Sequence, residues 1–94
     1  MSETIVDNQQ DRRFEVEVDG HRGELAYRID GQRLVLTHTG VADELEGQGI
    51  GGELVRAAVA RAAAESLTLV PNCQFARGWL ERHPQELTGV SVAW

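Results

Sequence analysis

Hydrophobic and polar residues alternate along the first half of the chain, which is the pattern of strands with one buried face. Three such runs occur, at residues 13–18, 23–29 and 33–39, and apolar residues occupy most of their alternate positions. The dipeptides Asp19-Gly20 and Asp30-Gly31 separate the runs and are typical of hairpin turns. The pattern therefore predicts a three-stranded antiparallel meander.

In the second half the apolar period changes from two to about four. Apolar residues recur at Ile50, Leu54, Ala58 and Ala62. This spacing predicts an amphipathic helix over residues 53–65 with one buried side. The apolar run at residues 67–70 then predicts a short buried strand, and the order strand, helix, strand implies a right-handed parallel crossover.

The end of the chain predicts one more helix and one more strand. Asn72, after Pro71, is the expected N-cap of a helix that ends at Pro84. Its expected buried face consists of Phe75, Ala76, Trp79, Leu80 and His83. Residues 87–94 alternate again and predict a closing strand. The predicted fold is α/β of the α+β type, with the order βββαβαβ, a mixed sheet and helices packed on it.

Composition limits what this domain does and where it works. Residues 1–12 are polar and aperiodic, so we expect a flexible tail before a single domain at residues 13–94. There is no leader-like start, no apolar run near the roughly 18 residues of a membrane span, and one cysteine, so we expect a cytoplasmic protein without membrane contact. The net charge of −6 argues against nucleic-acid binding. It suits a cationic partner such as an amine, or it only keeps the protein in solution. We expect a monomer or a weak dimer.

The most informative stretch is Glu46-Gly47-Gln48-Gly49-Ile50-Gly51-Gly52, which leads into the first predicted helix. Glycines allow close approach to the backbone, and the first turn of a helix offers free N–H groups at the positive end of its dipole. Together they form an anion site, most often for phosphate. A dinucleotide fold would need a strand directly before the loop and an acidic residue about 20 positions later, and a P-loop would need Gly-Lys-Ser/Thr. Here an acidic loop precedes the stretch, the next strand ends in Val70-Pro71-Asn72, and residues 52–54 read Gly-Glu-Leu. The sequence therefore fits neither a dinucleotide-binding fold nor a P-loop.

The segment Glu46–Gly51 resembles motif A, Q/R-x-x-G-x-G/A, of the GNAT superfamily of acyl-CoA-dependent N-acetyltransferases. The flanking segments Thr37-His38-Thr39, Pro71-Asn72-Cys73 and Gly78-Trp79-Leu80 are similar to the very small, stand-alone YjdJ-like branch of that superfamily. The resemblance extends from about Phe14 to Trp94. Glu46 stands where the family has Gln or Arg, and at an exposed site a carboxylate near a diphosphate costs roughly 1 kcal/mol or less.

The resemblance implies that the strands on either side of motif A and its helix splay apart and hold acetyl-CoA between them. Its pyrophosphate would bind the backbone N–H groups of Gln48, Gly49, Ile50, Gly51 and Gly52. Its pantetheine arm would follow the strand at Thr39 and Val41, with Asn72 and Phe75 also at the cofactor. Phe75 has a second interpretation as a core residue. No metal is implied, and the three histidines have no metal-ligand spacing.

Two residues are candidates for the chemistry, and each has a structural alternative. Cys73, expected in the first turn of the second helix, would have its thiolate favoured by the helix dipole and would take the acetyl group transiently or line the acyl pocket. Alternatively it is a small buried residue, as free cysteines often are. His38 follows Leu34 and Leu36 on one strand face and would be a base near the acyl group, or a hydrogen-bonded core residue. His21 and His83 are expected to be structural.

These patterns lead to two functional hypotheses. The first is an acetyl-CoA-dependent N-acetyltransferase that acts on a primary amine, either a small amine or a protein lysine. The second is a non-catalytic acyl-CoA-binding or protein-interaction module on the same fold, because the chain shows no clear general base and little material for an acceptor pocket.

Overall fold

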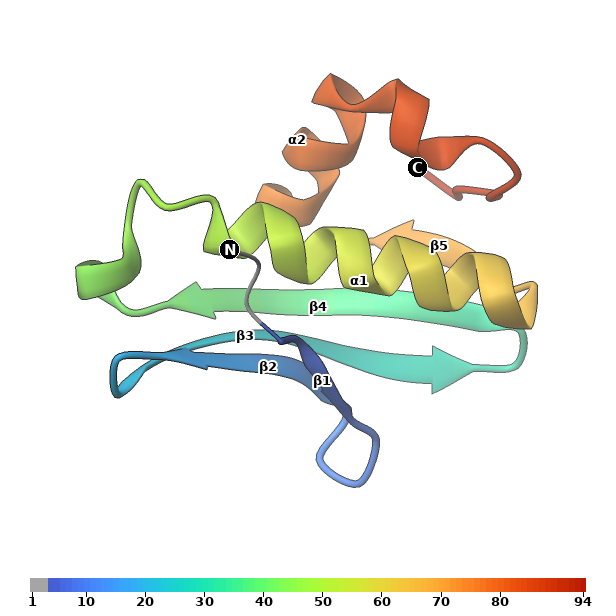
Figure 1. Ribbon diagram of the computed structural model, residues 1–94. Coiled ribbons are helices and arrows are strands. Elements are labelled where there is room, and N and C mark those ends of the chain that lie inside the picture. Colours follow the sequence, from blue (N-terminus) through green and yellow to red (C-terminus); the bar gives the residue numbers. More distant parts are fainter. Residues whose placement is uncertain (1–3) are drawn as a thin grey trace.

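Four consecutive strands form most of the sheet in the computed structural model, which describes residues 4–94 (Figure 1). Each pairs antiparallel with the next. A fifth strand, β5, pairs parallel with β4 and gives the sheet order β1-β2-β3-β4-β5. The strands are β1 (Val6–Asn8), β2 (Arg13–Val18), β3 (His21–Asp30), β4 (Arg33–Val41) and β5 (Thr68–Pro71). The predicted meander and the parallel crossover are confirmed.

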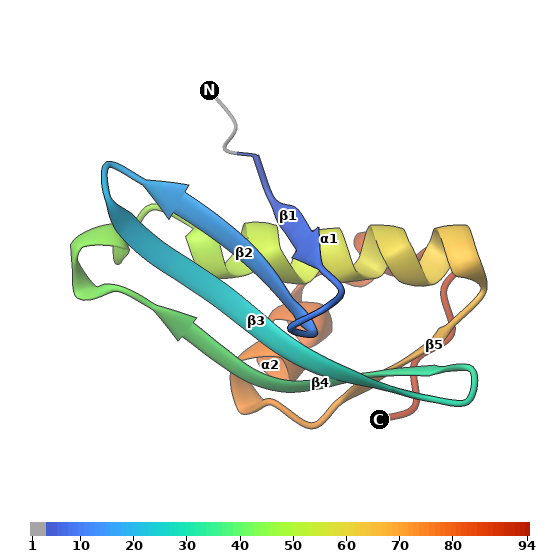
Figure 2. The ribbon, with the colours of Figure 1, turned by 90° about the horizontal axis from the view of Figure 1, so that it is seen from below.

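Both helices lie on one side of this sheet. The long helix α1 (Ile50–Glu65) crosses the sheet, and α2 (Gln74–Arg82) packs on α1 and on the ends of β4 and β5. Two short 3-10 turns, η1 (Asp43–Leu45) and η2 (Pro84–Leu87), precede α1 and follow α2. Seen from below, the strands lie in front of both helices (Figure 2), and no helix of residues 4–94 covers this second face.

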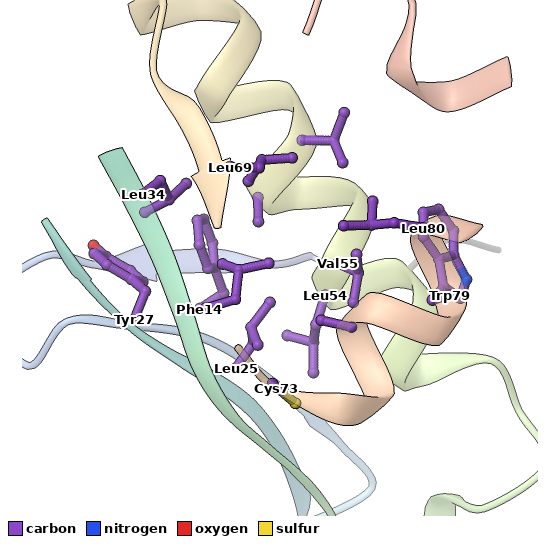
Figure 3. Packing of buried hydrophobic residues seen from close by; sticks show 14 of the residues in the cluster. Phe14, Leu25, Tyr27, Leu34, Leu54, Val55, Leu69, Cys73, Trp79 and Leu80 are labelled. Atoms are coloured by element: carbon purple, nitrogen blue, oxygen red, sulfur yellow. The ribbon is translucent and has the colours of Figure 1, made fainter. Parts of the chain in front are cut away.

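The apolar residues at alternate positions of the strands form one side of the hydrophobic core. Phe14, Leu25 and Leu34 contribute to it from three neighbouring strands, and each is at most 2% exposed. They pack with Leu54 of α1 and other apolar residues in one continuous cluster (Figure 3). Gly23 brings α1 close to the sheet, because a Cβ there would lie 2.9 Å from Cγ2 of Ile50. The start of α1, and with it the glycine-rich stretch, is therefore fixed against β3.

The observed order is ββββαβα, which corrects the predicted βββαβαβ at both ends. Residues 6–8 of the expected tail form β1, a strand too short to show a period; residues 1–3 lie outside the described residues. The expected closing strand at residues 87–94 is reduced to one parallel bridge between Leu69 and Val92. The segment turns through η2 and Gly89 (φ +79°), which leaves only its last residues beside β5. Two backbone hydrogen bonds hold it there: the N–H of Leu69 donates to the carbonyl of Ser91, and the N–H of Ala93 donates to the carbonyl of Leu69.

A polar cluster ties β1 to α1. The hydroxyl of Tyr27 donates to Oδ1 of Asp7 at 2.6 Å, and Arg61 donates to that hydroxyl at 2.7 Å and to Oδ2 of Asp7 at 3.0 Å. Burial, followed by the hydrogen bond to Asp7, raises the pKa of Tyr27 above its ordinary value of 10.0. The cluster explains why a three-residue strand holds its place.

Because the folded state raises the pKa of Tyr27, the stability that this group contributes is present below the pKa of the unfolded chain. That contribution is lost as the pH rises through the folded pKa. Tyr27 is the only tyrosine, so the absorbance of tyrosinate reports on it alone. We expect a higher titration midpoint in the native protein than in urea, and a smaller difference in Asp7→Asn. A native midpoint at or below that of the unfolded chain would contradict this account.

Candidate functional site

A wedge opens where β4 and β5 separate, as expected from the sequence. The two strands pair from Arg33 with Thr68 to Leu36 with Pro71. The backbone N–H of Cys73 then donates to the carbonyl of Leu36 at 2.9 Å, and the chain turns into α2. Since β4 continues to Val41, its edge facing β5 has no strand partner over residues 37–41. Unpaired backbone groups on a strand edge can bind an extended ligand that carries amides.

A pocket of about 350 Å³ lies beside this free edge. The outer part of β4, the turn η1, the glycine stretch, the start of α1 and one side chain of α2 enclose it. Its lining residues are Thr39, Val41, Leu45, Glu46, Gly47, Gly49, Ile50, Gly51 and Phe75. Most of its surface comes from apolar atoms, which is typical of a site for a small organic ligand.

The glycine stretch presents backbone donors to this pocket. Gly49 is the N-cap of α1 in the left-handed conformation (φ +75°), and no side chain caps the helix there. The first intrahelical hydrogen bond runs from the N–H of Glu53 to the carbonyl of Gly49. Within residues 4–94, the N–H groups of Ile50, Gly51 and Gly52 have no backbone acceptor. An anion would therefore meet several free donors at the positive end of the helix dipole.

The four glycines of the stretch have two different structural roles. Gly47 and Gly49 have positive φ, and a Cβ on either would project into open space. Gly51 and Gly52 instead give room to α2. A Cβ on Gly51 would lie 2.6 Å from Cζ of Phe75, and one on Gly52 would lie 2.5 Å from Nε1 of Trp79. Packing against α2 thus accounts for two of the four glycines, and the sequence alone did not reveal this role.

A β-bulge in β4 decides which side chains face the pocket. Tyr27 pairs with Leu36 and its neighbour Ala26 pairs with His38, so Thr37 is an extra residue in β4. From this residue onward, the side chains of β4 that would have faced one side of the sheet face the other. His38 therefore does not share a face with Leu34 and Leu36, which corrects the sequence analysis; it is exposed on the uncovered face of the sheet. The same reversal turns Thr39 and Val41 inward, where they line the pocket.

The side chain of Cys73 is in contact with that of Thr39. It is the N-cap residue of α2, with extended backbone angles, so it does not lie in the first turn and Asn72 is not the cap, contrary to the sequence analysis. Its Sγ is 3.1 Å from Oγ1 of Thr39, and either atom can be the donor. The side chain is 9% exposed and lies at the edge of the core (Figure 3). A group bound beside Thr39 would be close to this sulfur.

Some predicted site residues lie outside the pocket lining. The side chain of Gln48 donates to the carbonyl of Glu44 at 3.3 Å, Gly52 lies against Trp79, and Asn72 is exposed on the turn before α2. Leu45 also lines the pocket, which was not predicted from the sequence. It is 2% exposed and packs η1 against the core. A single leucine among the acidic residues of the run 43–46 is the feature of the sequence that could have indicated its burial.

The charges around the mouth of the pocket are mainly negative. Glu46 lines it with an exposed side chain, and Glu44 approaches Nδ1 of His21 at 3.6 Å. In the described part of the chain no three His, Cys, Asp or Glu side chains gather in a way that would hold a metal ion. No helix of residues 4–94 has the length and apolar character needed to cross a bilayer.

Comparison with known proteins agrees with this geometry. The family model of GCN5-related N-acetyltransferases matches residues 13–89. The chain also resembles the NMR solution structure of a GCN5-like protein from Staphylococcus aureus, for which an N-acetyltransferase assignment has been proposed. The two sequences are 31% identical, the TM-score is 0.75, and the match covers 100% of this chain and 94% of the other.

Proposed function

Because the chain belongs to the family of GCN5-related N-acetyltransferases, we propose that it transfers the acetyl group of acetyl-CoA to a primary amine. One observation supports this most directly: the pocket combines uncapped helix donors at one end with the free edge of β4 and Thr39 at the other. The donors suit a pyrophosphate and the strand edge suits the amides of a pantetheine chain. Acetyl-CoA carries both groups.

The residues divide between binding and chemistry. The N–H groups of residues 50–52 would hold the pyrophosphate, whereas the N–H of Gln48 already donates to the carbonyl of Leu45 at 3.3 Å. Val41 and Phe75 would flank the pantetheine. Asn72, at the turn where β5 ends, would lie at the edge of the same wedge. Glu46 weakens the attraction for phosphate, by roughly 1 kcal/mol or less at an exposed position. The main-chain donors are unaffected by it.

Two routes are consistent with Thr39 and Cys73. In direct transfer the amine nitrogen bonds to the acetyl carbon and loses a proton, while the carbon–sulfur bond breaks and the CoA sulfur keeps the electron pair and takes up a proton. In the covalent route the sulfur of Cys73 loses its proton and bonds to the acetyl carbon, while the CoA sulfur leaves with the electron pair and takes up a proton. The amine nitrogen then bonds to the acetyl carbon and loses a proton, and the sulfur of Cys73 leaves with the electron pair and is protonated again. In this route the hydroxyl of Thr39, whose Oγ1 is 3.1 Å from Sγ of Cys73, would donate to the thiolate of Cys73.

A second candidate function is an acyl-CoA-binding or interaction module without catalysis. The observation in its favour is that, among residues 4–94, Glu46 is the only acidic or basic side chain in the pocket lining. His38, the expected base, lies on the other face of the sheet.

Calorimetry with acetyl-CoA and CoA, followed by thiol release with a mixture of primary amines, tests both functions. We expect binding of both ligands and release of CoA that depends on the amine. Absence of binding at high micromolar ligand would contradict both functions, and binding without turnover on any amine would favour the module. All nine basic residues are arginine, so an acetyl group found on the chain cannot be on a lysine. A mass gain of one acetyl group that Cys73→Ala abolishes would identify the covalent route.

A further inference from the structure

The β-bulge places chemistry-bearing side chains on the face of the sheet that no helix of residues 4–94 covers. His38 and Gly40 face this side, while Thr39 between them faces the pocket. All three belong to the part of β4 whose outer edge has no strand partner. This part of β4 therefore lies between the pocket, which Thr39 lines, and the uncovered face of the sheet, on which His38 lies. A molecule on that face would reach past the free edge toward Thr39.

Two side chains converge over Gly40. A Cβ on this glycine would lie 3.4 Å from Nε2 of His38 and 3.8 Å from Cγ of Glu24, its partner residue on β3. The φ angle of Gly40 is not positive, so its backbone does not require glycine. The missing side chain instead leaves a space between the imidazole of His38 and the side-chain methylene next to the carboxylate of Glu24. We call Glu24, His38 and Gly40 the acceptor patch.

The carboxylate of Glu24 has no ion-pair partner within residues 4–94. It is half-buried beside the neutral Ala26, which is the partner of His38 in the sheet register. The other charged groups on this face of β2 and β3 are at residues 13, 15, 17, 22, 28 and 30. Glu15 lies directly opposite Glu24 and forms an ion pair with Arg13. The hydrogen bond to Glu15, and to a lesser extent the charge of Glu24, raises the pKa of Arg13, although Glu24 and Arg13 do not form an ion pair. Glu17 lies opposite Arg22. Glu24 is therefore the carboxylate next to His38 that has no ion pair of its own.

We propose that the acceptor patch receives the acceptor of the transfer reaction and that this acceptor is a diamine; the proposal rests on the proposed acetyltransferase function. The attacking nitrogen must be neutral, whereas a carboxylate binds a cation. A diamine meets both requirements: Glu24 holds its ammonium end, and His38 takes the proton from the reacting end. The nitrogen then bonds to the acetyl carbon, the carbon–sulfur bond breaks, and the CoA sulfur leaves with the electron pair and is protonated.

The test compares putrescine with butylamine, which has the same carbon chain and one amino group fewer. With the full-length protein and saturating acetyl-CoA, we expect kcat/KM for putrescine to be about tenfold higher. Glu24→Gln should lower kcat/KM for putrescine toward the value for butylamine. Gly40→Ala should raise KM for putrescine without changing the Kd of acetyl-CoA. His38→Asn should lower kcat for both amines and leave the Kd of acetyl-CoA unchanged. Glu17→Gln, a carboxylate of the same face outside the patch, is the matched control.

NMR titration of the CoA-bound protein with putrescine separates this inference from the proposed function. Amide shifts centred on residues 24, 38 and 40 without acetyl transfer would support the acceptor patch and overturn the transferase. Transfer that all three patch variants leave unchanged would overturn the patch and leave the transferase. Putrescine shifts centred elsewhere, or none, would overturn the patch whether or not transfer occurs.

Discussion

Gly49→Val is expected to lower the affinity for acetyl-CoA by about a hundredfold or more, which corresponds to roughly 3 kcal/mol. Gly49 caps α1 at φ +75°, a conformation that costs a residue with a side chain about 1–2 kcal/mol. Its Cβ would also project into open space along the pocket lining. A valine would therefore distort the first turn of α1 and fill the space next to its donors. Calorimetry with acetyl-CoA measures the loss.

Gly31→Val is the matched control for this variant. Gly31 has φ +62° in the turn between β3 and β4, and a Cβ there also meets nothing within 4 Å. The backbone strain is comparable, but the residue is not part of the pocket lining. We expect similar losses of thermal stability in the two variants and a change of Kd only in Gly49→Val. Equal affinity in both would show that the pyrophosphate does not bind at this loop.

The elements with a sustained apolar period were predictable from the sequence. The meander and α1 each bury a face over several turns or strand repeats, so their pattern is repeated often enough to be read. The strand β1 has three residues and depends on Asp7 meeting Tyr27 and Arg61, a contact between distant parts of the chain. The C-terminal segment alternates as a strand does, yet Trp94 finds no face to bury it and remains 52% exposed.

The bulge in β4 shows why the candidate base was misplaced. Leu34, Leu36 and His38 have the spacing of one strand face, and nothing local interrupts it. The reversal becomes visible only through the partner strand, where Tyr27 and Leu25 must both face the core and pair with Leu36 and Thr39. Pairing between strands is a tertiary property. The sequence therefore predicted which strand carries the chemistry but not the face on which each side chain lies.

Gly52→Ala is expected to lower the free energy of unfolding by about 2 kcal/mol and the melting temperature by roughly 8–16 °C. Alanine normally favours a helix over glycine by up to about 1 kcal/mol. Here its Cβ would lie 2.5 Å from Nε1 of Trp79. This ring cannot easily withdraw, because it is 6% exposed and stacks on His83 at 4.1 Å. The overpacking should therefore outweigh the gain in helix propensity.

The sign of this effect should reverse when Trp79 is replaced by leucine. In Trp79→Leu the space next to Gly52 is free, so adding Gly52→Ala should stabilise the protein by up to about 1 kcal/mol. Denaturant unfolding of the four proteins in this double-mutant cycle measures the coupling. If Gly52→Ala raised stability in the wild-type background, the glycine would not be needed for packing. The backbone N–H of residue 52 survives both substitutions, so a double variant that binds acetyl-CoA as the wild type does would show that the ligand does not require a glycine at this position.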